Sequence, residues 1–186
     1  MPLLEPESGK CLLALARKSI AHGLRFGSPL RVEPSEWPEA LQAPGASFVT
    51  LRRKGALRGC VGTLERHLPL VVDVAQNAWR AAFEDSRFPP LRAQEQTGLQ
   101  VQVSVLGALA PFSVASRAEL LAALEPGKTG LVLAEGVKRA TFLPAVWDSL
   151  EAPQDFVSQL MAKAGLPEDH WSPDLRFWRY TVQELS

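Results

Sequence analysis

The feature that most constrains the fold is a pair of glycines inside a segment that otherwise has the pattern of a β-strand. The segment is Leu57-Arg58-Gly59-Cys60-Val61-Gly62-Thr63, and it follows a turn signal at Lys54-Gly55. Glycine inside a strand costs conformational entropy and offers no side chain to pack. We therefore expect either a group that approaches this backbone closely or a bend in the backbone. The segment is the first candidate for a functional site.

Length and composition predict one globular domain, or two closely joined lobes. The chain has 186 residues, of which 46% are hydrophobic, which is enough for a substantial core. Its 20 basic residues balance 20 acidic ones. This balance argues against a dedicated duplex-DNA-binding protein, whose surface would be cationic, but it is compatible with a local basic patch.

The cysteines and the N-terminal sequence predict a soluble, cytoplasmic protein with no membrane partner. Cys11 and Cys60 lie far apart in different kinds of segment, so we expect a reducing compartment rather than a disulfide framework. Charges at Glu5, Glu7 and Lys10 interrupt the apolar run that a signal peptide would need. No stretch approaches the length of a membrane span.

The periodicity of hydrophobic residues predicts a hairpin, a helix and a strand in that order, twice along the chain. The first set is a hairpin over 47–53 and 56–64, a helix opened by Pro69 and a strand over 99–105. The second set is a hairpin over 131–134 and 137–143 with its turn at Glu135-Gly136, a helix over 153–164 and a strand over 175–185. The two sets share no sequence identity that would support a duplication. Separate hairpins and helices favour an α+β fold with mainly antiparallel sheet. A doubly wound fold is disfavoured because the βαβ alternation and a G-x-G-x-x-G loop are missing.

Two further helices are predicted outside these sets. Apolar residues recur at helical spacing over 12–24, with Ser8 as the expected N-cap and Gly23 as the expected stop. Ser116 and Glu119 form a capping-box pattern before a short helix.

Two motifs together identify a family that the chain resembles. They are the arginine-glycine-cysteine motif at 57–63 and the stretch Asp85-Ser86-Arg87-Phe88-Pro89-Pro90-Leu91. With them the sequence resembles the AMMECR-type domain family, called AmmeMemoRadiSam system protein A in bacteria and archaea. Further matching stretches run in order from about Pro44 to Trp171: Phe48-Val49-Thr50-Leu51, Asn77, Ala81-Ala82-Phe83, Ser104-Val105-Leu106, Gly130-Leu131-Val132-Leu133, Phe142-Leu143-Pro144, Val146-Trp147 and Lys163-Ala164-Gly165-Leu166. Val61 and Ser86 stand where isoleucine and proline are usual in the family.

The resemblance implies an α+β fold in which residues 1–186 form a single AMMECR-type domain with two tightly packed lobes and a cleft between them. It also implies genetic company with a Memo-like protein and a radical S-adenosylmethionine enzyme, which are the expected partners. It supplies no reaction. The chain has no Cys-x-x-Cys pair to hold the iron–sulfur cluster of a radical enzyme, and its three histidines fit no metal spacing. We therefore expect no cofactor.

Cys60 is the candidate catalytic residue. In the functional interpretation, Arg58 and nearby backbone N–H groups favour its thiolate form, which would act as a nucleophile or covalent carrier. In the structural interpretation, Cys60 is a small buried hydrophobic residue on a strand. The sequence leaves both open, because it places no histidine beside the thiol.

The candidate ligand-binding residues are Arg58, Gly59, Gly62, Asn77, Asp85 and Arg87. Two guanidinium groups could bind a carboxylate or phosphate bidentately, and the glycines would let a ligand reach the main chain. The alternative is that each arginine pairs with a structural acid such as Asp85 or Glu84; we favour this pairing for Arg87 and leave both interpretations open for Arg58. Likewise, Asn77 could bind a ligand or tie down backbone carbonyls, and Asp85 could pin the turn at Arg87; for these two residues we favour the structural role.

Three functions are compatible with these residues. The first is a binding or adaptor protein whose cleft around Cys60 takes a small anionic ligand or a modified partner. The second is an enzyme or covalent carrier that uses the Cys60 thiolate. The third is nucleic-acid binding through Arg52-Arg53-Lys54, although charged hairpin tips commonly serve solubility. We favour the first, because the sequence shows no Ser-His-Asp order, metal motif or phosphate loop.

Overall fold

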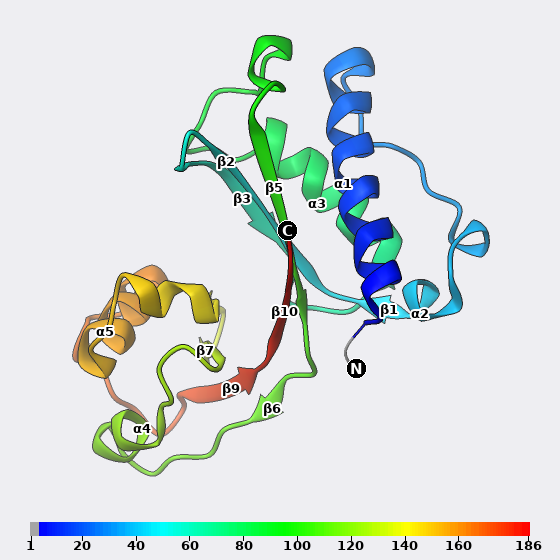
Figure 1. Ribbon diagram of the computed structural model, residues 1–186. Coiled ribbons are helices and arrows are strands. Elements are labelled where there is room, and N and C mark those ends of the chain that lie inside the picture. The colour runs from blue at the N-terminus through cyan, green and yellow to red at the C-terminus, as the bar shows by residue number, and fades with distance from the viewer. Residues whose placement is uncertain (1–3) are drawn as a thin grey trace. The chain divides into compact units, whose positions relative to one another are not determined.

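The computed structural model describes residues 4–186, and the chain divides into two compact units (Figure 1). Unit 1 extends to Leu106 and takes in Gln183–Ser186, and unit 2 is Gly107–Val182. Both units combine antiparallel strand pairs with packed helices, which confirms the α+β class. None of the helices within residues 4–186 combines the length and apolar character that a membrane span requires. The cleft between lobes stays a prediction.

Unit 1 is built on a four-stranded sheet in the order β10-β5-β2-β3. The strands are β2 (Ser47–Arg53), β3 (Ala56–Gly62), β5 (Leu99–Leu106) and β10 (Val182–Leu185). The β2–β3 hairpin turns at Lys54 and Gly55, whose φ angles are 52° and 80°. Two positive φ angles in a row are typical of the tight turn that matches the twist of a hairpin.

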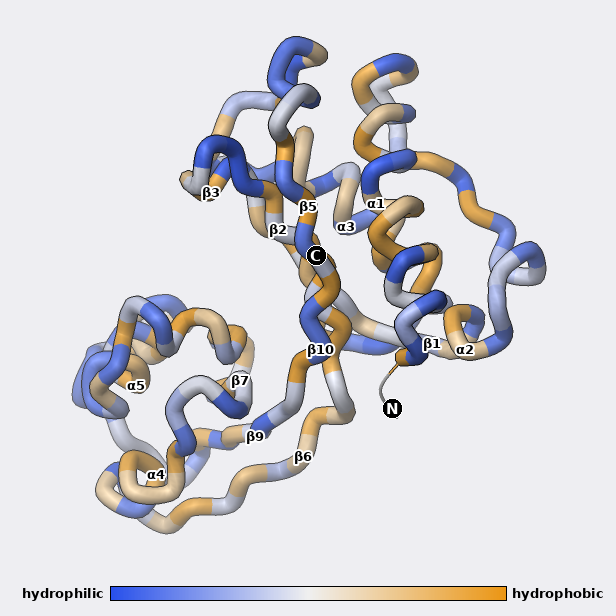
Figure 2. Tube along the Cα trace, in the orientation of Figure 1, coloured by the Kyte–Doolittle hydropathy of each residue, from blue (hydrophilic) through white to orange (hydrophobic). Residues whose placement is uncertain are grey.

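Two helices cover one face of this sheet, as Figure 1 shows. α3 (Leu70–Phe83) packs over β2 and β3, and α1 (Pro6–Phe26) packs over β5 and against α3. The strand residues beneath them are apolar and buried, and they include Val49, Leu51, Val101, Val103 and Val105. Figure 2 shows the alternation of hydrophobic and hydrophilic residues along β5. The sheet therefore has an apolar face under the helices and a polar face opposite.

α1 is longer at both ends than the periodicity predicted. It ends at Gly27, whose φ of 71° is the left-handed conformation that commonly terminates helices. Gly23, the predicted stop, lies inside the helix. A side chain at this position would collide with Trp79 and Phe83 of α3, so the glycine allows the two helices to pack closely. Ser8, the predicted N-cap, is also buried within the helix, which instead has a proline in its first turn.

Unit 2 repeats the connectivity of unit 1. Its four-stranded sheet has the order β6-β9-β7-β8. Its elements are β6 (Ala110–Pro111), α4 (Arg117–Ala123), β7 (Gly130–Glu135), β8 (Lys138–Phe142), α5 (Pro153–Lys163) and β9 (Arg176–Tyr180). β7 pairs with both β8 and β9, as β2 pairs with both β3 and β5. The two predicted hairpin-helix-strand halves are therefore confirmed, together with the cap of α4, where Ser116 accepts from the Glu119 N–H at 3.1 Å.

Two predicted boundaries differ from the structure. The last strand divides into β9 and β10, which join different sheets. The second hairpin turns at Gly136-Val137, one residue later than predicted, with Gly136 at a φ of 57°. The remaining short elements are η1 (Pro34–Glu36), α2 (Glu39–Gln42), β1 (Pro44–Gly45), β4 (Leu68–Pro69), η2 (Ala93–Glu95) and η3 (Pro144–Asp148).

Candidate functional site

The two glycines of the motif are explained by close contacts within the chain. A Cβ atom at Gly59 would collide with the carbonyl oxygen of Ala81 in α3. A Cβ atom at Gly62 would collide with the Phe48 ring and the Ser47 carbonyl. The predicted close approach is therefore made by α3 and by β2, and it lets the helix lie directly on the strand. Contact of either glycine with a ligand stays a prediction.

Asp85 and Arg87 bind the outer edge of β3, the last strand of the sheet. Asp85 accepts a hydrogen bond from the Cys60 N–H at 2.8 Å, and Arg87 donates from Nη2 to the Cys60 carbonyl at 3.2 Å. The two side chains also pair with each other through two hydrogen bonds of 2.9 and 2.7 Å. An unpaired strand edge invites pairing with another chain. This pair, which we call the edge clasp, occupies the place of a neighbouring strand at Cys60.

Arg58 forms a second connection between β3 and the loop after α3. Its Nε and Nη2 donate to the two carboxylate oxygens of Glu95 at 2.8 and 3.0 Å, and Nη2 also donates to the Pro89 carbonyl. The Phe88 ring lies 5.9 Å from the guanidinium carbon of Arg58 and 5.6 Å from that of Arg87. Both arginines that were candidates for an oxyanion are thus paired with carboxylates of this chain, as the structural alternative proposed.

These ion pairs shift the pKa of both carboxyl groups. Hydrogen bonds from Arg87 hold the pKa of Asp85 well below its usual range, although burial acts in the opposite direction. The hydrogen bonds from Arg58 lower the pKa of Glu95 to about 2. Both groups are therefore charged at neutral pH. One charged pair, Arg58–Glu95, joins β3 to the loop, whereas the Asp85–Arg87 pair lies within the loop and holds β3 through hydrogen bonds to the Cys60 backbone.

We expect the Arg58–Glu95 pair to contribute to the loss of stability at acidic pH. A carboxylate whose pKa is lowered in the folded state stabilises the fold at pH values above its pKa in the unfolded state, which is about 4.3 for glutamate. That contribution is lost as the pH falls toward about 2. In Glu95→Gln the free energy of unfolding, measured by urea denaturation, should therefore fall less steeply between about pH 5 and pH 2. The exposed Glu36→Gln should keep the wild-type slope. An unchanged slope in Glu95→Gln would contradict this assignment.

Asn77 belongs to a buried polar cluster between α3 and β2, formed with Ser47, Thr63 and Asp73. Its Nδ2 donates to the Ser47 carbonyl at 3.1 Å and to Asp73 at 3.0 Å, and the hydroxyls of Ser47 and Thr63 also donate to Asp73. Burial raises the pKa of Asp73, while these hydrogen bonds oppose the shift. Asn77 is 1% exposed, so its amide serves as the internal tie to a backbone carbonyl. Its binding of a ligand stays a prediction.

The Cys60 side chain lies on the polar face of the sheet. Its Sγ is 3.4 Å from the Oγ1 of Thr50, directly opposite on β2, and the thiol is free and partly exposed. The histidines contact other groups: His22 lies against Phe26, His67 against Glu65 and His170 against Glu135. The hydrogen-bonding neighbours of the sulfur are thus the Thr50 hydroxyl and the Arg87 guanidinium, and neither group is a general base.

A cavity of about 400 Å³ adjoins this face beside Thr50. It is lined by residues of α1, β2 and β5 and by the residue after β10, namely Arg17, Thr50, Arg52, Leu99, Gln100, Val101, Gln102 and Ser186. Small-molecule sites commonly occupy about 300–1,000 Å³. Sequence reasoning missed this site, because Arg17 is distant in sequence and Arg52 was considered only within a basic run.

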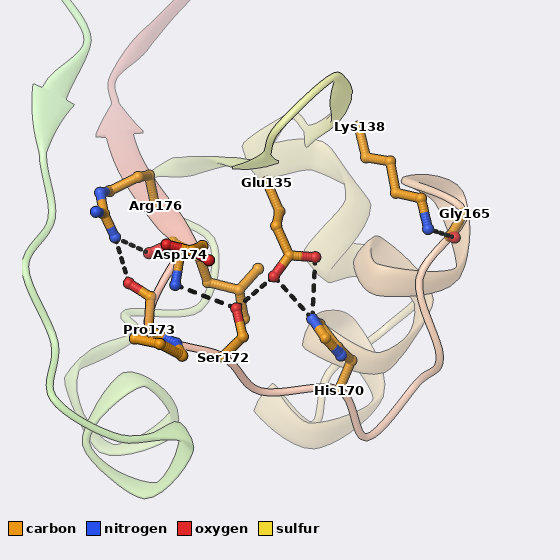
Figure 3. A network of polar contacts seen from close by, with 9 residues as sticks. Glu135, Lys138, Gly165, His170, Ser172, Pro173, Asp174 and Arg176 are labelled. Atoms are coloured by element: carbon orange, nitrogen blue, oxygen red, sulfur yellow. Dashed lines mark hydrogen bonds and ion pairs between the residues drawn. The ribbon is translucent and has the colours of Figure 1, made fainter.

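A separate polar network lies in unit 2 (Figure 3). The carboxylate of Glu135 lies 2.9 Å from Nε2 of His170 and also accepts from the Ser172 hydroxyl. Because histidine and serine each contact the carboxylate rather than each other, the three residues do not form a serine–histidine relay. The network attaches the segment before β9 to β7. Within residues 4–186, no group of three or more His, Cys, Asp or Glu side chains is placed to hold a metal ion.

Comparison with known proteins gives matches over nearly the whole chain. The sequence model of the AMMECR1 family matches residues 13–185. A protein of Methanothermobacter thermautotrophicus is 35% identical over 97% of this chain and 94% of its own length, and one of Methanopyrus kandleri is 35% identical over 95% and 87%. The crystal structure of an uncharacterized protein from Pyrococcus horikoshii aligns with a TM-score of 0.89 at 30% identity, covering 97% of this chain and 92% of that one.

Proposed function

This chain belongs to the AMMECR1 family, and we propose that it is a binding or adaptor protein that acts with a Memo-like protein and a radical S-adenosylmethionine enzyme. The proposed site is the polar sheet face that carries Cys60, and its occupant is a small anionic ligand or a modified partner. The genetic company implied by the family supports the two partners. The two free cysteines support a reducing compartment, the cytoplasm, as the place of action.

The observation that carries this proposal is the way in which Cys60 is presented. The edge clasp binds both of its backbone polar groups, while its thiol is partly exposed between Thr50 and solvent. A side chain on a backbone that is already ordered loses little further entropy when it binds a ligand. The adjoining cavity supplies space for that ligand.

We expect a complex between this protein and at least one of the two partner proteins of the same genome. Native mass spectrometry after co-expression would detect the complex and any added mass on Cys60. Cys60→Leu should weaken the complex, because a bulky side chain would cover the polar face beside Thr50. Cys11→Leu is the matched control, since Cys11 packs against the core of unit 1 on α1. Failure to bind either partner, or equal binding by the Cys60 variant, would count against the proposal.

The alternative is an enzyme or covalent carrier that uses the Cys60 thiolate. This alternative is favoured by the partly exposed sulfur, which lies on the strand that contains Arg58 and is held by Arg87. However, both guanidinium groups are paired with carboxylates. The rate of iodoacetamide alkylation at Cys60, compared with an unstructured cysteine peptide, separates the two functions. The binding proposal expects a rate no faster than the peptide. A rate about tenfold faster would favour the thiolate alternative.

A further inference from the structure

We infer that the cavity between Arg17 and Arg52 binds the oxyanion group, a phosphate or carboxylate, of a small molecule. This inference rests on the proposed binding function and identifies the residues that recognise the charge. They are not the arginines of the two sequence motifs. They come instead from α1 and from the far end of β2, and they line the cavity together with Thr50, whose hydroxyl contacts the Cys60 sulfur.

The guanidinium groups of this region differ in whether a carboxylate of the chain already binds them. Arg58 and Arg87 each direct two donors at a carboxylate of this chain, to Glu95 and Asp85. Arg17 and Arg52, in contrast, make no ion pair with any residue in the range 4–186. The contact that Arg52 does make is a 3.4 Å approach to the Gly55 carbonyl. Two exposed guanidinium groups at one cavity attract an anion, which they can bind through paired N–H donors.

The other side chains that line the cavity are neutral. Thr50, Gln100 and Gln102 supply neutral hydrogen-bonding groups, and none of the lining side chains is acidic. The carboxylate of Glu184, which is not part of the lining, accepts a hydrogen bond from the Gln102 side-chain amide at 2.9 Å and so orients that amide. Leu99 and Val101 add apolar surface. This combination suits a ligand with one charged end and a partly apolar body.

The size and position of the cavity suit a small molecule. A cavity of about 400 Å³ accommodates a small molecule and is too small for a folded partner. Thr50 both lines the cavity and contacts the Cys60 sulfur, so a ligand that reaches Thr50 lies next to the thiol. Thr50 therefore connects the anion site to the presented cysteine on unit 1.

The test is an NMR titration of the purified protein with inorganic phosphate and, separately, with acetate. We expect saturable shifts of the side-chain amide signals of Gln100 and Gln102, and the tighter of the two probes identifies the preferred oxyanion. Arg17→Gln and Arg52→Gln should each weaken binding of that probe by about tenfold, as expected for loss of charged hydrogen bonds. Lys18→Gln is the matched control, because it removes the same charge from the neighbouring position on α1 without lining the cavity.

The inference is overturned if neither probe moves the two amide signals, or if Lys18→Gln weakens binding as much as Arg17→Gln. Thermal melts of the variants exclude unfolding as the cause of a loss. Failure here is distinct from failure of the proposed function, which is measured by the partner complex. Variants that bind the probe like the wild type would refute this anion site and leave the adaptor role standing.

Discussion

Gly59→Ala is expected to destabilise the protein by roughly 3 kcal/mol or more, the upper end of what overpacking costs. The added methyl group would meet the carbonyl oxygen of Ala81, which belongs to the backbone of α3. A flexible side chain could rotate away, but a helix carbonyl can move only if the helix moves. Urea denaturation monitored by circular dichroism would measure the change in the free energy of unfolding.

Two companion variants make this prediction specific. Cys60→Ala changes the next residue, on the opposite face of the same strand, and should cost about 1 kcal/mol or less. Shortening the neighbouring side chain in Gly59→Ala/Leu51→Ala should not restore stability, because the obstacle is the backbone of α3 and not Leu51. A Gly59→Ala protein within about 0.5 kcal/mol of the wild type would show that α3 does not lie against β3 in this way.

Asp85→Ala is expected to cost about 2–3 kcal/mol, because it leaves the Cys60 N–H without its acceptor and Arg87 without its carboxylate. The value lies below that of a fully buried pair, because the Arg87 side chain is 54% exposed and water can replace part of the interaction. Asp85→Asn should cost less than Asp85→Ala, since an amide oxygen still accepts from the Cys60 N–H. Hydrogen exchange at the Cys60 amide should accelerate in the order wild type, asparagine, alanine.

Glu84→Ala is the control for this series. Glu84 is the preceding residue and makes a half-exposed ion pair with Arg80 on the surface of α3. Such pairs contribute about 0–1 kcal/mol. If Asp85→Ala costs no more than Glu84→Ala, the edge clasp does not stabilise β3, and the two motifs need another explanation.

Much of the architecture could be predicted because it depends on local periods and turns. The Lys54-Gly55 turn permits two positive φ angles, and the alternation of β5 places valines on one face of the sheet. The repeated order of hairpin, helix and strand follows from the same signals. The boundaries of α1 were less predictable. Gly23 was predicted to end the helix, but it lies inside it, where only a glycine leaves room for Trp79 and Phe83.

The candidate site was predicted only in outline. The motif residues lie together, since Cys60, Asp85 and Arg87 are joined by hydrogen bonds. Glu95 was missed as the partner of Arg58, and so was the cavity beside Arg17 and Arg52. In each case the partners are far apart in the chain, and no period or turn signal specifies which distant side chain a guanidinium group will meet.

The amino-acid sequence alone determined the family and the α+β class. It also determined that the arginine-glycine-cysteine motif lies on a strand after a tight turn. Only the tertiary structure decided which group meets each glycine, which carboxylate pairs with each arginine, and where the last strand divides between two sheets. The physical reason is range. Hydrophobic period and turn geometry act between near neighbours, whereas packing and ion pairing join residues that folding alone brings together.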